Sequence, residues 1–350
     1  MRIQEAKERL DHIIAISRVH LYKPIQIAEI LNRHRTGNPS FDLTNLDQYR
    51  NRSKEWRDLI SMRLVGNVST SSQKYQDNLF EDNAIPREAI VALDEANRKT
   101  GGSVEAYIYK KFEERQEKVS ILHDELLKAT KETFKLSEII AKFDDPGLKR
   151  SVDKIYEITV YALFNTLVEA LNAQITLSVE KDRKDILEEF GDFTSLLLGI
   201  SGDVMQYSTK ARLFRAGVAN AADTGIDIWT NFGPTVQVKH VSLTYELAED
   251  IAEKVVADNL VIVCRDAESA TINKIVSQLG LGDKVRGVVE QRQLEEWYSK
   301  ALRGKCSGEL GDKLLDQFRR EFEIEFPFSS NLKEFLRERG YDKMKTDGWY

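Results

Sequence analysis

The first 143 residues are patterned as a series of amphipathic helices. Apolar residues recur three and four positions apart, in sets such as Leu10, Ile13, Ile14, Ile27, Ile30 and Leu31. This spacing places them on one side of a helix. The strongest interruption in the chain is Asp144-Asp145-Pro146-Gly147, and we predict a domain boundary there.

The segments that follow the boundary combine helices with one strand. Residues 155–171 are hydrophobic on too many sides for a surface helix, which predicts a helix buried in a core. Residues 174–180 alternate between apolar and polar positions as a strand does, and residues 185–200 return to helical spacing.

From residue 211 the pattern changes to short strands. Residues 211–215 are a candidate strand, and residues 225–229 and 235–239 alternate cleanly on either side of a turn, which predicts a hairpin. An amphipathic helix at 243–255 precedes the fully apolar run 260–264, whose uniformity indicates burial on both faces. A helix at 271–279, a strand at 285–289 and a helix from residue 291 complete the predicted elements.

This order of elements predicts an α/β fold, with a mixed sheet behind a large helical N-terminal region. We expect a helical region at 1–145, an α/β core at 146–300 and a C-terminal extension at 301–350.

Composition narrows the class of protein. No apolar run reaches the roughly 20 residues that span a bilayer, and the first residues form an amphipathic helix rather than a signal peptide, so we expect a cytoplasmic protein. The two cysteines and five histidines lack the spacing of a disulfide framework or a zinc site. Any bound metal is therefore expected to have oxygen ligands.

Charge is distributed unevenly along the chain. The net charge is −6, but residues 1–75 hold 13 Lys and Arg against 8 Asp and Glu, a net of +5 that leaves −11 for the remainder. A basic segment of this kind is compatible with a nucleic-acid partner in spite of the acidic total.

Three polar side chains fall on one side of the predicted hairpin. Because side chains alternate between the faces of a strand, Asp227 points away from the face of its isoleucine neighbours, and Gln237 and Lys239 point away from that of Val236 and Val238. Oxygen ligands beside an ammonium group are what metal-dependent phosphodiester hydrolysis requires. The three residues therefore predict a catalytic centre, with Asp227 and Gln237 as ligands of Mg²⁺ and Lys239 serving the attacking water.

One carboxylate is few for a divalent ion, so we expect a second from the helices before the hairpin. The candidates are Glu169, Glu157, Glu188 and Glu189. By spacing alone, an Asp followed by a polar-x-Lys is more typical of a solvated hairpin face. The surrounding order of hairpin, helix and buried strand favours a nuclease core.

Two stretches also resemble a known family. Residues 215–240, which include Asn220, Asp223 and Gly225-Ile-Asp227-Ile-Trp229, resemble type II restriction endonucleases of the HaeII type, within the PD-(D/E)xK nuclease superfamily. So does the opening stretch Arg18-Val-His20-Leu-Tyr22-Lys23-Pro24. In two places the sequence departs from the superfamily pattern, since Gln237 replaces the usual acid and Ala222 precedes Asp223.

The resemblance implies magnesium-dependent double-strand cleavage of a short, GC-rich palindrome by a homodimer, with a methyltransferase that acts on the same site. It also implies that the helical region contributes DNA contacts and dimerisation. The DNA contacts we expect are Arg18, His20, Lys23, Arg33, Arg35, Ser71, Lys74, Arg212, Arg215 and Asn220.

The basic stretch 33–63, with Tyr49 and Trp56 interleaved, suits a phosphate-binding face, although a solvated helical face explains such runs more often. Two alternatives remain, a non-catalytic DNA-binding protein on a decayed nuclease fold and a modification-dependent or repair nuclease. The recognition sequence, cut position and overhang do not follow from periodicity.

Overall fold

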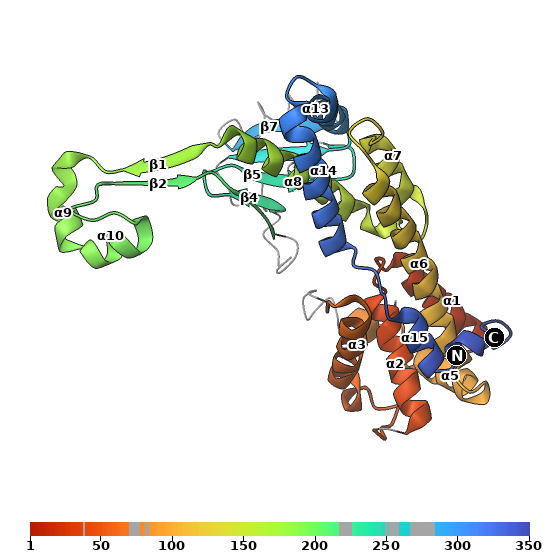
Figure 1. Cartoon of the computed structure of the whole chain (residues 1–350). Coiled ribbons are helices and arrows are strands. Elements are labelled where there is room, and N and C mark those ends of the chain that lie inside the picture. Colours follow the sequence, from red (N-terminus) through yellow and green to blue (C-terminus); the bar gives the residue numbers. More distant parts are fainter. Residues whose placement is uncertain are drawn as a thin grey trace. The chain divides into compact units, whose positions relative to one another are not determined.

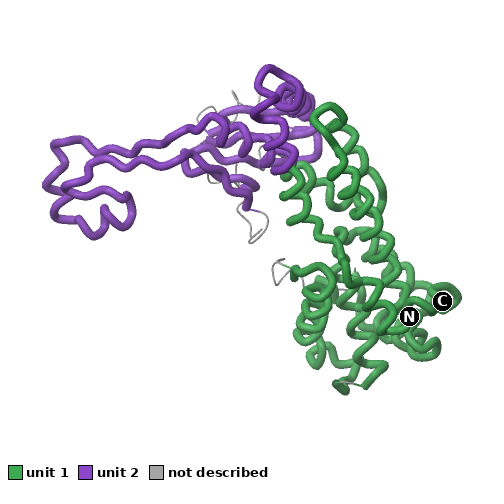
Figure 2. The backbone as a smooth tube through the Cα atoms, in the orientation of Figure 1, with its two compact units in different colours: residues 1–158, 217–223, 318–350 green, residues 159–216, 224–317 purple. Residues whose placement is uncertain are grey.

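The computed structural model describes residues 1–37, 39–69, 78–80, 84–216, 226–244, 246–248, 251, 259–266 and 284–350. The chain forms two compact units (Figure 2). Unit 1 comprises residues 1–158, 217–223 and 318–350, and unit 2 comprises residues 159–216 and 224–317. Helices α8 (Val152–Leu171) and α14 (Ser307–Glu325) each contribute residues to both units. The segment that the sequence set apart as a C-terminal extension is therefore shared between the units.

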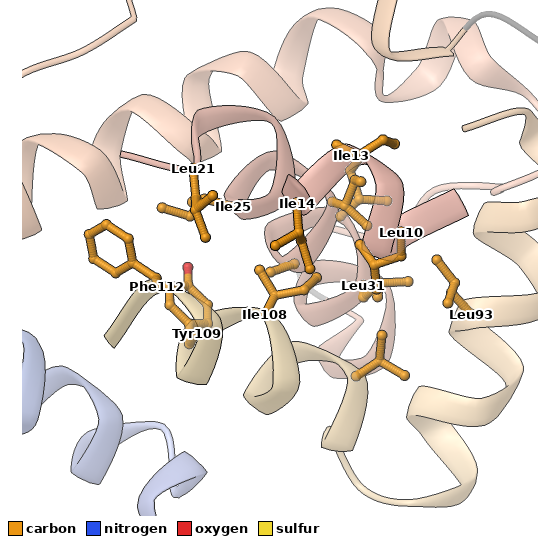
Figure 3. Packing of buried hydrophobic residues seen from close by; sticks show 14 of the residues in the cluster. Leu10, Ile13, Ile14, Leu21, Ile25, Leu31, Leu93, Ile108, Tyr109 and Phe112 are labelled. Carbon is orange, nitrogen blue, oxygen red and sulfur yellow. The ribbon is translucent and has the colours of Figure 1, made fainter. Parts of the chain in front are cut away.

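Unit 1 is helical, as the periodicity predicts. Its α-helices are α1 (Ile3–Ile16), α2 (Tyr22–Thr36), α3 (Arg50–Val65), α5 (Arg87–Lys99), α6 (Ser103–Lys128), α7 (Leu136–Ala141) and α15 (Leu332–Glu338), together with the adjoining parts of α8 and α14. Leu10, Ile13 and Leu31, from the repeating apolar sets, are fully buried in the main hydrophobic cluster (Figure 3). C-terminal residues such as Phe335 join the same cluster.

A buried polar network lies inside this helical unit. The Glu105 carboxylate is inaccessible to solvent and accepts hydrogen bonds from Arg35 Nε at 2.8 Å and Asn97 Nδ2 at 2.6 Å. Asn32 and Tyr341 donate to it as well. Burial by itself raises the pKa of Glu105, but these hydrogen bonds outweigh it, so the pKa lies below its ordinary value. The spacing of residues along the chain gives no sign of this network.

Unit 2 contains a five-stranded mixed sheet, which confirms the predicted fold class (Figure 1). The strand order is β3 (Leu213–Arg215), β4 (Ile228–Thr230), β5 (Thr235–Val238), β6 (Leu260–Cys264) and β7 (Val285–Glu290). Strands β3, β4 and β5 pair antiparallel, whereas β5, β6 and β7 pair parallel. Helix α13 (Gln291–Arg303) follows β7 directly, where the sequence predicts a helix.

The region between β5 and β6 agrees with the predicted amphipathic helix where it is described. Leu243, Ala248 and Ile251 are buried and pack in one cluster with Ile262 and Val285 of the sheet. The predicted helix at 271–279 lies outside the described residues.

The predicted strand at 174–180 belongs to a separate two-stranded ribbon. Strand β1 (Gln174–Ser178) pairs antiparallel with β2 (Gln206–Lys210), a partner that the alternation did not reveal. Between them, the single helix predicted at 185–200 is two short helices, α9 (Lys184–Glu189) and α10 (Gly191–Leu198). We call residues 174–210 the arm. Figure 1 shows α9 and α10 at the end of the ribbon that is far from the sheet.

Candidate active site

The predicted hairpin forms, and its register brings the candidate residues together. Ile228 of β4 lies opposite Val236 of β5, so Asp227, the residue before β4, lies beside the end of β5 that carries Gln237 and Lys239. The connecting turn contains Gly233 at φ +112°, a conformation that L side chains rarely adopt. Asp227 directly precedes β4 and Lys239 directly follows β5, so the site lies where this pair of strands leaves the sheet.

The Asp227 side chain is anchored to the neighbouring strand. Its Oδ2 accepts a hydrogen bond of 2.7 Å from the backbone N–H of Val238, the residue between Gln237 and Lys239. Its own backbone N–H donates to the Val236 carbonyl at 3.0 Å. These bonds fix the carboxylate beside the segment that carries the other two candidates.

Gln237 is more enclosed than the alternation suggested. Val236, Gln237 and Val238 are all buried, because β5 lies between β4 and β6 in the middle of the sheet. Gln237 is 3% exposed, and its Oε1 is buried without a hydrogen-bond partner among the residues that the structure describes. A buried acceptor that lacks a donor costs free energy unless something else satisfies it. A cation beside Asp227 would do so.

Lys239 and His240 extend from the end of β5. The backbone N–H of Lys239 donates to the Val263 carbonyl at 2.8 Å, so the chain is still tied to β6 at this point. The Lys239 side chain is partly exposed. The strand alternation puts Lys239 on the side of Gln237 and His240 on the other side.

Among the four candidate carboxylates, Glu169 is the one placed near the sheet. It lines a cavity of ≈ 620 Å³ together with Arg212 and Phe214 from the segment that forms β3. Phe214 stacks on Trp229 with ring centroids 4.1 Å apart, and Trp229 lies two residues from Asp227. Asn165 Nδ2 donates to Glu169 at 3.0 Å.

The other three carboxylates have different surroundings. Glu157 belongs to unit 1, is buried and pairs with Lys154 at 2.7 Å. Glu188 and Glu189 are exposed on helix α9 of the arm. No group of three or more His, Cys, Asp or Glu side chains within the described ranges has the arrangement of a metal site.

Several predicted DNA contacts are engaged inside unit 1. Arg35 is bound to Glu105, and Arg18 pairs with Asp153. Burial lowers the pKa of His20 to about 4, with the charge of Arg18 as a smaller cause, so this imidazole is neutral at pH 7. Lys23 is partly exposed. All of these remain predictions as DNA contacts.

The prediction that Tyr49 and Trp56 belong to a phosphate-binding face is wrong. Tyr49 and Trp56 are 0% and 6% exposed and belong to the hydrophobic core of unit 1, with Tyr49 directly before α3 and Trp56 within it. Arg33 and Arg52 lie over the Trp56 ring, at 5.9 and 5.7 Å from its centroid. Rings in this position pack the core and are not free to stack on bases.

Two predicted contacts of unit 2 are described, and three others in the chain are not. Arg212 is exposed, and its backbone N–H donates to Asn231 Oδ1 at 2.8 Å. Arg215 is partly exposed at the end of β3. Ser71, Lys74 and Asn220 lie outside the described residues, as do Ala222 and Asp223.

Comparison with known proteins identifies the family. The profile described as HaeII restriction endonuclease matches residues 6–341. The chain belongs to the HaeII restriction endonuclease family. It is 47% identical to the type II restriction enzyme HaeII of Haemophilus aegyptius over 344 residues, which cover 97% of each chain. It is 46% identical to the type II restriction enzyme NgoBI of Neisseria gonorrhoeae over 343 residues, again 97% of each chain.

Membership of the HaeII family makes the chain a type II restriction endonuclease, an enzyme that hydrolyses DNA at specific sequences. Enzymes of this type generally use divalent metal ions. None of the helices that the structure describes is long and apolar enough to cross a membrane. No solved structure gives a significant match.

Two features of the site were beyond sequence reasoning. The hydrogen bond from Val238 N–H to Asp227 is made by the backbone, which every residue carries, so no residue type signals it. The burial of Gln237 depends on β6, which lies more than 20 positions along the chain. The apolar character of 260–264 was the signal that pointed to a central sheet.

Proposed function

We propose that this restriction endonuclease cleaves both strands of a short, GC-rich palindrome by magnesium-dependent hydrolysis, with Asp227, Gln237 and Lys239 as its catalytic centre. The observation that carries the proposal is the 2.7 Å hydrogen bond between Val238 N–H and Asp227 Oδ2. It holds the carboxylate against the backbone between the other two residues. The palindromic target rests on the resemblance of residues 215–240 to the family.

The donor set fits a hard cation. Asp227 supplies a carboxylate, and Gln237 supplies a buried amide oxygen that has no donor within the described part of the chain. Mg²⁺ prefers such oxygen ligands. A bound Mg²⁺ ion supplies a Lewis acid that lowers the pKa of water and offsets the negative charge of the phosphate. Glu169, which lines the cavity beside β3, is the candidate for a second carboxylate.

Lys239 is the proposed residue that acts on the attacking water and the phosphate. Its ammonium orients the attacking water and stabilises the negative charge that develops on the phosphate oxygens. The backbone that carries Lys239 is held on one side by the bond of its N–H to Val263 and on the other by the bond of Val238 N–H to Asp227. A pre-positioned charge acts without the cost of reorganisation during the reaction.

The quaternary and cellular parts of the proposal follow from the palindrome. A homodimer places one catalytic centre on each strand of a twofold-symmetric site. A methyltransferase that modifies the same sequence protects the host DNA in the cytoplasm. The DNA contacts proposed are Arg18, His20, Lys23, Arg33, Arg35, Ser71, Lys74, Arg212, Arg215 and Asn220.

The test is digestion of unmethylated plasmid and phage DNA with Mg²⁺. Asp227→Asn and Lys239→Met are compared with the exposed-site controls Asp124→Asn and Lys128→Met. Discrete fragments from the wild type and both controls, with at least ~1,000-fold slower cleavage by the two site variants, support the proposed centre.

Three outcomes contradict the proposal. If the wild type binds DNA but never cuts it, the decayed-nuclease alternative holds, and the departure at Gln237 explains it. If it cuts only methylated or damaged DNA, the enzyme is a modification-dependent or repair nuclease. If Asp227→Asn cleaves DNA at the normal rate, the catalytic centre does not include Asp227 and lies elsewhere in the chain.

A further inference from the structure

The arm exposes an unusual amount of apolar surface. Six large side chains of residues 186–204 are more than half exposed, namely Ile186 52%, Phe190 54%, Phe193 58%, Leu196 91%, Leu197 66% and Val204 53%. Together they present on the order of 600 Å² of apolar area, at the upper end of the ~300–600 Å² of the largest patch on a typical monomer. Such an area approaches the ~800 Å² that each partner buries in a stable protein interface.

The arm has little core of its own. Between residues 180 and 205, Leu187, Thr194 and Ile200 are the buried side chains. Among the described residues, every hydrogen-bond partner of residues 180–205 belongs to the arm itself. A two-stranded ribbon with two short helices is marginally stable in water unless it packs against something else. The arm therefore needs a partner to cover it.

Charge indicates what that partner is. Residues 174–210 contain seven Asp and Glu against four Lys and Arg, and residues 185–192 contain four acids and no base. Phosphate groups would be repelled by this segment, so DNA is a poor occupant. A second arm would repel it for the same reason. The surface suits a protein site that is apolar in the middle and basic at its rim.

Unit 2 itself contains such a site. A cavity of ≈ 590 Å³ is lined by the apolar side chains of Leu167, Trp297, Ala301 and Leu310, with Lys300, Lys305 and Cys306. Residues 297–308 contain three basic residues and no acid. The arm helices lie at the far end of the ribbon from α13, so the arm of a second molecule is better placed to fill this cavity (Figure 1).

We propose that two copies of the chain exchange arms, with Phe190, Phe193, Leu196 and Leu197 of each copy packed into the Trp297–Leu310 cavity of the other. The acids of residues 185–192 then lie against Lys300 and Lys305. Two reciprocal contacts of this kind close a twofold dimer. The inference rests on the homodimer of the proposed function and names its interface.

The first test measures assembly by sedimentation velocity over a range of concentrations. The full-length triple variant Phe190→Ser/Leu196→Ser/Leu197→Ser changes exposed residues only, and circular dichroism checks that it is folded. We expect a wild-type dimer and a dissociation constant raised on the order of 100-fold or more in the variant. The matched control, Leu59→Ser/Met62→Ser/Ile121→Ser, alters exposed apolar residues of unit 1 and should leave the dimer unchanged.

The second test locates the contact. In Leu196→Cys, a short bis-maleimide should join the new thiol to the exposed Cys306 of the other copy and give a covalent dimer. Burial raises the pKa of Cys264 to about 12, so that thiol stays protonated and unreactive. The dimer band should disappear in Leu196→Cys/Cys306→Ser. A band that persists there would show arm-to-arm contact and overturn the cavity assignment.

A third test reverses charges, to distinguish electrostatic attraction between the arm and the cavity from apolar packing. Lys300→Glu/Lys305→Glu should weaken the dimer, and adding Glu188→Lys/Glu189→Lys should restore it. A lack of restoration contradicts the proposed pairing.

Failure of this inference differs from failure of the proposed function. If the triple variant remains a dimer, the arm is not the interface but the homodimer stands. If it remains a dimer and loses DNA binding, the arm is a DNA contact instead. A wild type that is monomeric with and without DNA overturns both the homodimer and the arm exchange, while its cleavage of DNA still tests the catalytic centre.

Discussion

Gln237 illustrates how a single residue trades stability for function. Its Oε1 is buried, and none of the described residues donates a hydrogen bond to it, an arrangement that costs about 1–3 kcal/mol when nothing satisfies the acceptor. A leucine of similar volume would remove this cost. The glutamine is therefore best explained by a ligand that its oxygen meets when the enzyme acts.

We expect Gln237→Leu to raise the free energy of unfolding by about 1–2 kcal/mol and to abolish cleavage, because it removes both the buried acceptor and the metal ligand. Gln237→Glu should keep cleavage and require less Mg²⁺, since a carboxylate binds the cation more strongly than an amide does. Urea unfolding and Mg²⁺ titration of plasmid cleavage check both variants. Exposed Gln293→Leu is the control, and an active Gln237→Leu enzyme would disprove the role of the amide.

Glu105 provides a prediction about pH. Its pKa in the folded protein lies below the ordinary value of 4.5, so its contribution to stability is full above that pH and is lost as the pH falls through the folded pKa. Glu105→Gln should therefore lower the free energy of unfolding by roughly 3 kcal/mol at pH 7. The difference from wild type should shrink below about pH 4. A difference that is the same at pH 7 and pH 3 would contradict this account.

At the scale of elements, backbone carbonyls at helix ends in unit 1 accept hydrogen bonds from side chains that are distant in sequence. Arg115 of α6 is 5% exposed and donates to the carbonyls of Ser17 at 2.6 Å and Arg18 at 2.9 Å, just beyond α1, and also to that of Ile14. Burial lowers the pKa of Arg115 to about 10, which still leaves it charged at pH 7. A positive charge at a helix C-terminus is favourable.

Arg115→Met should cost about 3 kcal/mol of unfolding free energy, because it leaves several partly buried carbonyls without a donor while keeping most of the apolar volume. Hydrogen exchange should show the largest loss of protection in the last turn of α1. Exposed Arg150→Met serves as the matched control. Equal stability of the two variants would mean that water replaces the arginine.

For the whole molecule, the proposals couple assembly to the pattern of cleavage. A dimer with one centre per strand should convert supercoiled plasmid to linear DNA with little nicked intermediate. The triple arm variant, as a monomer, should accumulate nicked circles and recover linear product only at high protein concentration. A time course on agarose gels measures this. Linear product without nicking from a proven monomer would contradict the coupling.

What the sequence determined by itself is the local and periodic part of the molecule. The apolar spacing of residues such as Leu10 and Leu31 specified the helices, and the alternation around Asp227 and Gln237 specified a hairpin, because helix and strand periods are properties of neighbouring residues. The uniformly apolar run 260–264 likewise indicated a buried strand. Motif resemblance added the family.

The tertiary structure decided which surfaces meet. Tyr49 and Trp56 have the same local pattern in a core as on a DNA-binding face, and packing alone settled that they are buried. Whether Gln237 is solvated depended on β6 lying beside it, and the arm became visible only when β1 paired with β2 across some 30 intervening positions. Burial and long-range pairing depend on contacts between distant residues, and no periodicity within a short window records them.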